Sequence, residues 1–139
     1  GRTFYFCNTH LDHEVQAARE KSAELIRQRI GRLPTDSPLF LVGDFNSIAV
    51  ANRTYDILTK EAGVTDTWSA ARERRNEDAN SFTGFGPLRH EGERIDWILA
   101  RGAMDVRATE VVTFRHGDQW PSDHLPVVAW ITLQQSPDQ

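Results

Sequence analysis

Asp44 and Asn46 are two residues apart in the stretch GDFN, directly after the apolar run Leu39–Val42. If Phe45 between them faces the core, the alternation of an extended chain places both polar side chains on the opposite side. A carboxylate beside an amide can hold a water molecule with one group and a phosphate oxygen with the other. A plain turn explains the same residues equally well, because Asp and Asn are common turn formers.

Asp96 lies inside the apolar stretch RIDWIL, residues 94–99. A buried carboxylate without a partner is costly, or its pKa shifts until the group is neutral. The N–H of a histidine is a natural partner, and the bond would fix the tautomer and orientation of the imidazole. The alternative is a structural salt bridge to Arg94 or Arg101, although these long side chains can reach solvent.

The segment Ser122-Asp123-His124 stands between two prolines, just before another apolar stretch. One interpretation is a capped turn. The other is that Asp123 binds a divalent cation while His124, braced by Asp96, faces a reacting group. Oxygen ligands suit Mg²⁺ or Mn²⁺, whereas a zinc site would show more His or Cys at close spacing.

His10 follows the end of an expected strand and completes the set of candidates. The remaining histidines lie in polar surroundings and are expected at the surface; these are His13, His90 and His116.

The elements that must position these residues follow from the apolar pattern. Helices are expected from Asp12 to Gly31 and over residues 52–62. The charged segment 68–77 is a further candidate helix. Residues 81–86 form a short strand or loop. If the strands share one sheet, the polar residues can meet at one edge, in an α/β or α+β domain. The expected strands are Thr3–Asn8, Leu39–Val42, Ile95–Ala100, Val106–Phe114 and Pro126–Leu133.

The length, net charge, cysteine count and apolar runs of the chain limit the class of protein. A chain of 139 residues is enough for one domain. Its net charge of −4 argues against a broad basic surface for nucleic acid, but bound divalent cations can still attract a phosphate substrate. A lone cysteine, Cys7, excludes an internal disulfide, and no apolar run approaches the roughly 20 residues of a membrane span. The compartment stays open between cytoplasmic and secreted.

Four motifs together resemble the endonuclease/exonuclease/phosphatase superfamily, which has the DNase I-like fold. They are NTHLDH, GDFN, RIDWIL and SDHLPVV, and they occur in the family's order from about Asn8 to Val128, most like its bacterial members. The resemblance implies a divalent-metal-dependent hydrolase of phosphate esters, either a phosphodiesterase or a phosphomonoesterase. In such an enzyme, water attacks phosphorus in line with the leaving alcohol.

The resemblance also implies roles for the residues that face the water and the metal. Asp44 would orient or deprotonate the attacking water. Asn46 would hold the phosphate and help to place metal or water, and Asp123 would lie at the metal site. The implied cofactor is Mg²⁺ or Mn²⁺, bound by Asp123, Asp44 and Asn46.

The phosphate itself would be contacted by histidines. His124, braced by Asp96, would stabilise the charge on the non-bridging oxygens. His10 would contact the phosphate or act as a general acid near the leaving oxygen. The dyad of Asp96 and His124 is consistent with phosphoryl transfer, in which positioning and electrostatic stabilisation dominate.

The fold implied by the resemblance is half of a four-layer α/β sandwich in which two sheets pack face to face. Residues 1–139 would be the carboxy-terminal portion of one domain, and would supply one mixed, mostly antiparallel sheet of about six strands with two or more helices on one face. The chain begins with Gly1 and reads as a segment of a longer protein, and the resemblance implies that the missing amino-terminal half is its partner. Without it we expect weak metal binding, little activity and self-association through an exposed apolar sheet face.

The substrate stays open among small molecules, lipid headgroups and nucleic acids, although the acidic balance disfavours a nonspecific nuclease. The basic cluster Arg72, Arg74 and Arg75 is expected to be a solvated helix face. A different class is a non-catalytic fragment that acts only as a folding or interaction piece. Such a fragment would be expected to lose one of the five central residues, which are all present: Asp44, Asn46, Asp96, Asp123 and His124.

Overall fold

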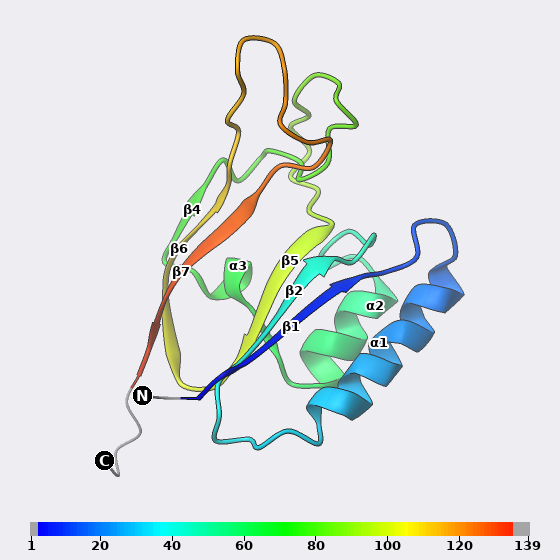
Figure 1. The fold of residues 1–139 in the computed structure, drawn as a ribbon, viewed down its shortest axis with the longest axis vertical. Coiled ribbons are helices and arrows are strands. Elements are labelled where there is room, and N and C mark those ends of the chain that lie inside the picture. The colour runs from blue at the N-terminus through cyan, green and yellow to red at the C-terminus, as the bar shows by residue number, and fades with distance from the viewer. Residues whose placement is uncertain (1–2, 135–139) are drawn as a thin grey trace.

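The computed structural model describes residues 3–134, whose strands form two sheets (Figure 1). One sheet has the order β1-β2-β5-β3 and the other β4-β6-β7. No helix in this part of the chain is both long and apolar enough to cross a membrane. The elements are β1 Tyr5–His10, α1 Gln16–Ile30, β2 Leu39–Asp44, α2 Arg53–Asp56, the π-helical segment η1 Ile57–Glu61, β3 Thr65–Asp66, α3 Thr67–Ala70, β4 Glu73–Arg75, β5 Asp96–Arg101, β6 Met104–Val111 and β7 Val127–Leu133.

One face of the first sheet is covered by α1, α2 and η1 (Figure 1). Leu39 and Leu41 of β2 point into this layer and are buried, because they alternate with the outward-facing residues of the strand. Phe45 follows them and stacks on Trp97, with the ring centroids 4.2 Å apart. The α/β class, the two early helices and the inward position of Phe45 are therefore confirmed.

The opposite face of the same sheet has no helical cover among the described residues. Phe6 pairs with Phe40 across β1 and β2, and Phe6 is 62% exposed. Together with residues of β7, these side chains line a groove of about 790 Å³. A continuous apolar run such as Leu39–Val42 is typical of a strand covered on both faces, but this prediction is wrong, because Phe40 and Val42 are only half-buried on this side.

The expectation of a single sheet is also wrong, although the strands pair in the mixed, mostly antiparallel way foreseen. Both edges of β5 are occupied, by β2 along its length and by β3 at Leu99 and Ala100. β6 follows β5 directly but finds no free edge, so it pairs with β4 and β7 in a second sheet. The two sheets still belong to the half-sandwich that the sequence predicted.

The segment 68–77 is helical only at its start. α3 ends at Ala70, and residues 73–75 then pair in parallel with β6 as the edge strand β4. The basic cluster therefore lies beside a strand and not on a helix. Each of its arginines forms an ion pair with an acid, namely Arg72 with Asp105, Arg74 with Glu77 and Arg75 with Glu73.

A buried ion pair fixes the segment that enters β5. Arg94 is 5% exposed, contrary to the expectation that it reaches solvent, and its Nη2 donates to Oδ2 of Asp66 at 3.0 Å. Its guanidinium also lies 4.5 Å from the ring centroid of Trp68. Breaking such a pair on one side leaves an uncompensated buried charge, so the pair holds this part of the chain in one arrangement.

Gly43 is required by the close approach of β1 to β2. Its φ is +142°, and a Cβ built on it would lie 1.8 Å from the carbonyl oxygen of Thr9, its partner across the two strands. No side chain fits there unless the strands separate. The residue therefore controls the pairing immediately before Asp44.

We expect Gly43→Ala to lower the free energy of unfolding by about 3 kcal/mol or more, because the new methyl group must displace backbone. Urea unfolding followed by circular dichroism measures this loss. Gly63→Ala is the control, since that glycine has φ +67° with no atom within 4 Å of an added Cβ; it should cost only about 1–2 kcal/mol. Equal losses for the two variants would contradict the steric explanation.

The uncovered sheet face leads to a second expectation, that the chain on its own self-associates through Phe6 and its neighbours. Phe6→Lys should shift the molecule toward the monomer in sedimentation velocity over a concentration series. Leu25→Lys, which changes a similarly exposed apolar residue on the helical side, should leave the association unchanged. A wild-type chain that stays monomeric at high concentration would show that this face needs no cover.

Candidate active site

The register of three neighbouring strands places three polar side chains in one row. His10, the last residue of β1, pairs with Asp44, and Asp44 in turn pairs with Asp96 across β2 and β5. Residues directly opposite one another in a sheet point to the same face. The row therefore lies on the uncovered face of the sheet, and Asp44 and Asp96 form the polar end of the groove lined by Phe6, Val42 and Ile98.

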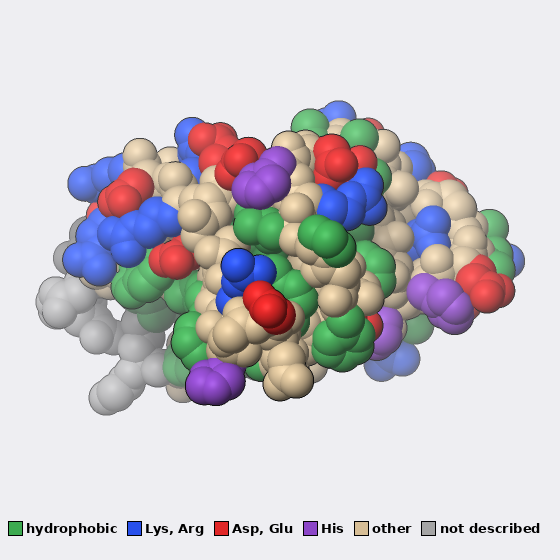
Figure 2. Space-filling model, turned by 90° about the horizontal axis from the view of Figure 1, so that it is seen from above, with side chains coloured by type: hydrophobic (Ala, Val, Ile, Leu, Met, Phe, Trp, Pro, Cys, Tyr) green, Lys and Arg blue, Asp and Glu red, His purple; other side chains and the backbone are tan. Residues whose placement is uncertain are grey.

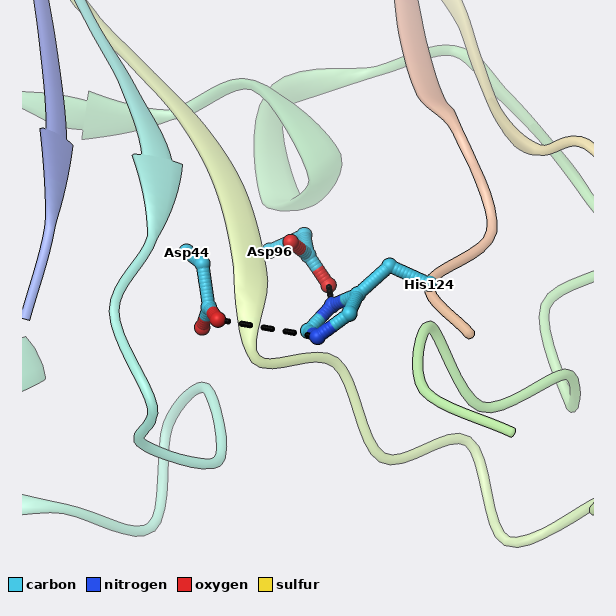
Figure 3. A group of neighbouring side chains, drawn as sticks. All are labelled: Asp44, Asp96 and His124. Carbon is cyan, nitrogen blue, oxygen red and sulfur yellow. Dashed lines mark hydrogen bonds and ion pairs between the residues drawn. The ribbon is translucent and has the colours of Figure 1, made fainter. Parts of the chain in front are cut away.

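His124 reaches this row from the loop that precedes β7 (Figure 3). Its Nδ1 lies 3.0 Å from Oδ2 of Asp96, and its Nε2 lies 3.7 Å from Oδ2 of Asp44. Asp96 thus has a histidine partner of the kind expected from the sequence, while Arg94 and Arg101 bind elsewhere. The ligand atoms of Asp44, Asp96 and His124 lie within 4.8 Å of one another and could hold a metal ion.

The two oxygens of Asp44 have different partners. Oδ1 accepts a hydrogen bond from the backbone N–H of Asn46 at 2.8 Å, so the turn anticipated for GDFN is present. Oδ2 faces the imidazoles of His124 and His10. The amide nitrogen of Asn46 donates to the carbonyl of Leu11 at 2.9 Å and lies 3.3 Å from Oδ2 of Asp44. The stretch is therefore both a turn and part of the cluster.

His10 lies at the open side of the row. Its Nε2 is 3.3 Å from Oδ2 of Asp44, and its side chain is 71% exposed, so it can contact a ligand bound from solvent. The other three histidines, His13, His90 and His116, are exposed and lie outside the cluster, as expected.

Asp123 is adjacent to His124, but its carboxylate is not a member of the group formed by Asp44, Asp96 and His124. Its Oδ1 accepts a hydrogen bond from the hydroxyl of Ser122 at 3.3 Å. Its backbone carbonyl accepts from the N–H of Thr83 at 2.8 Å. The metal-binding role expected for Asp123 stays a prediction.

The electrostatics of the dyad reflect its half-buried position. Burial raises the pKa of Asp96, although hydrogen bonds from His124 and Ser81 counteract this effect. Burial alone would lower the pKa of His124, but the hydrogen bond to Asp96 and the charges of Asp96, Asp44 and Asp123 outweigh it, so the pKa is raised. The raised pKa favours an imidazolium that can meet an anionic group.

Charge elsewhere on the surface is mixed. In the view from above, Lys and Arg side chains lie among Asp and Glu and do not form one broad basic area on that face (Figure 2). The most compact basic cluster in the sequence is tied up in the ion pairs of Arg72, Arg74 and Arg75.

Two residues beside the cluster were missed in the sequence, where 81–86 reads only as an aromatic strand or loop. The hydroxyl oxygen of Ser81 accepts from the N–H of Ile95 at 2.9 Å and from that of Asp96 at 3.3 Å. The ring of Phe82 lies 4.9 Å from that of His124. The alternation of Ser81, Phe82 and Thr83 is the only hint, because it turns the aromatic ring away from two buried neighbours.

Comparison with known proteins agrees with this arrangement. The profile of the Endonuclease/Exonuclease/phosphatase family matches residues 2–124. No significant match was found among curated proteins. The chain is similar to a mannosyl-6-phosphatase of Bacteroides thetaiotaomicron, with 28% identity and a TM-score of 0.80 over 92% of this chain and 51% of that one.

Two further solved structures are similar. A family protein of Bacteroides vulgatus shares 28% identity with a TM-score of 0.78, over 90% of this chain and 48% of its own. Sphingomyelinase C of Streptomyces griseocarneus shares 17% identity with a TM-score of 0.59, over 89% and 51%, which shows the fold alone. The chain thus spans about half the length of these structures. From the profile match and the row of motifs, the chain belongs to the Endonuclease/Exonuclease/phosphatase family.

Proposed function

We propose that this chain is the carboxy-terminal portion of a domain that hydrolyses phosphate esters with the help of a divalent cation. The observation that carries the proposal is the convergence of Asp44, Asp96 and His124 from three separate segments to within 4.8 Å. Two carboxylates at such short range repel each other, and a cation or a charged imidazole between them offsets this repulsion. Membership of a family of nucleases and phosphatases supports the same chemistry.

The donor set fits Mg²⁺ or Mn²⁺. Oδ2 of Asp44 faces the open side of the row, and Oδ1 of Asn46 has no hydrogen-bond partner among the described residues. Oxygen donors of this kind suit hard cations. Asp44 and Asn46 would hold the ion, while the negative charge of Asp123 helps to raise the pKa of His124. The cation supplies positive charge that offsets the charge of the phosphate.

The residues of this chain have separate roles in the hydrolysis of the ester. Oδ2 of Asp44 orients the attacking water and accepts its proton, and the new O–P bond forms as the bond to the alcohol breaks. His124, braced by Asp96, donates to the non-bridging oxygens. His10, exposed at the edge of the row, contacts the phosphate or returns a proton to the leaving oxygen.

A phosphomonoester of a small alcohol is the substrate that we favour. The mannosyl-6-phosphatase is similar over nearly the whole of this chain. The paired arginines of residues 72–75 offer no free basic track for a nucleic acid. Hydrolysis assays of the full-length protein with Mg²⁺ or Mn²⁺, each with a chelator control, should therefore show turnover of sugar phosphates above that of DNA, phosphoinositides or sphingomyelin.

An amino-terminal half completes the domain in this proposal. It would cover the apolar face that carries Phe6 and Phe40, and would border the polar row at the end of the same strands. The chain by itself would then bind metal weakly and serve mainly as a folding partner for the other half. The coverage of about half of each similar structure supports this division.

Replacing His124 with Ala in the full-length protein should lower kcat by about 10²- to 10⁴-fold, because the phosphate loses its charged donor. Circular dichroism should show an unchanged fold. His90→Ala is a matched control, since His90 pairs with Asp78 at the surface and lies outside the cluster. Near-normal turnover by His124→Ala would remove this residue from the mechanism.

Asp96→Asn should slow the reaction by roughly 10- to 100-fold, since the imidazole keeps a neighbour of the same size but loses its charged brace. The effect should appear in kcat more than in KM. Asp78→Asn makes the same change in the exposed His90 pair and should have no effect. Unchanged activity in Asp96→Asn would assign Asp96 a purely structural role.

A further inference from the structure

Phe82 is an aromatic side chain on the rim of the proposed site. Its ring centroid lies 4.9 Å from that of His124, and the two rings are inclined by 54°. The backbones of the two residues also pair in an isolated antiparallel bridge. Although it touches the dyad, Phe82 remains 40% exposed, so part of a large apolar ring faces solvent beside the phosphate-binding residues.

The position of Phe82 is fixed by its neighbours. Ser81 is fully buried, and its carbonyl accepts a hydrogen bond from the N–H of Leu125 at 2.7 Å. Thr83 donates its N–H to the carbonyl of Asp123 at 2.8 Å. The residues on both sides of Phe82 are therefore bonded to the segment that carries His124. These bonds hold the backbone of Phe82 beside the segment that carries His124.

Gly84 keeps the ring uncovered. It has φ +60°, and a Cβ on this residue would lie 3.4 Å from Cζ of Phe82. The ring thus lies against a residue without a side chain. A larger residue at this position would contact the ring and adopt a strained backbone. The loop presents an aromatic surface that nothing in the described chain covers fully.

We propose that Phe82 is a specificity-determining residue that packs against the ring of the alcohol in the phosphate ester. This inference rests on the proposed function. When the phosphate contacts His124, the alcohol is the next group along the ester, and Phe82 is the aromatic neighbour of that histidine. An aromatic face gains most from a ligand that is itself a ring with an apolar side.

The chemistry of the ester favours alcohols whose ring lies one carbon from the ester oxygen, such as hexopyranose 6-phosphates. In these compounds the ring is one carbon away from the ester oxygen, close enough to reach a side chain that touches the phosphate-binding histidine. In a nucleoside 5′-phosphate the base is separated from the phosphate by the whole ribose. In a glycerol phosphate no ring is present, which makes this compound the reference for the experiment.

The test measures binding of two non-hydrolysable phosphonate analogues to the full-length protein by calorimetry with Mg²⁺ present. One is the analogue of mannose 6-phosphate and the other that of glycerol 3-phosphate. The wild type should bind the hexose analogue about tenfold more tightly. Phe82→Ala should bring the ratio of the two Kd values close to one, with the Kd of the glycerol analogue unchanged. Phe82→Leu, which keeps apolar volume without an aromatic face, should give an intermediate ratio.

Phe85→Ala is the matched control, because Phe85 lies in the same loop and is more exposed, but has no ring contact with His124 among the described residues. It should preserve the wild-type ratio. Three results would overturn the assignment of Phe82. They are an equal loss of binding of both analogues in Phe82→Ala and Phe82→Leu, a ratio of Kd values that these variants leave unchanged, and a wild type that shows no preference for the hexose analogue. Hydrolysis assays run in parallel keep the two proposals apart. A hexose preference that Phe82→Ala abolishes, in a protein without hydrolysis, contradicts only the proposed function, whereas normal hydrolysis without such a preference contradicts only the role of Phe82.

Discussion

The pairing of β2 with β1 on one side and β5 on the other is the constraint on which the site depends. This register sets His10, Asp44 and Asp96 side by side. A shift of one residue would turn Asp44 toward the helices and bring Phe45 out of its stack on Trp97. The hydrophobic core and the polar row are therefore specified by the same alternation, and neither can change alone.

Contacts outside the strand pairing hold the remaining residues of the site in place. His124 belongs to no strand, and its place relative to Asp96 is maintained by the loop that carries Ser81 and Phe82. The start of β5 is held from the other side by the buried pair of Arg94 and Asp66. A charge buried in this way contributes little net stability but penalises alternative arrangements of the chain. The dyad is thus supported by the hydrogen bonds to Ser81 and by the ion pair of Arg94 with Asp66.

Much of this arrangement could be predicted from the sequence, because the cues were local. The apolar Phe45 between two polar residues indicated its inward position, alternation then placed Asp44 and Asn46 on the other side, and the cost of desolvating Asp96 indicated a histidine partner. The division into two sheets could not be foreseen, since β3 has only two residues and leaves no periodic pattern. The burial of Arg94 depends on Asp66 and Trp68, which are distant in sequence. The position of the Asp123 carboxylate depends on a loop conformation for which adjacency to His124 is no guide.

The hydrogen bond from the N–H of Asn46 to Oδ1 of Asp44 has a consequence for binding. A free aspartate rotates about its terminal bond and loses that freedom when it coordinates an ion or water. In this protein the rotation is already restricted in the folded chain, so the entropic cost falls on folding and not on capture of the ligand. The turn that shapes GDFN thereby holds Oδ2 toward the imidazoles of His10 and His124 as a preorganised acceptor.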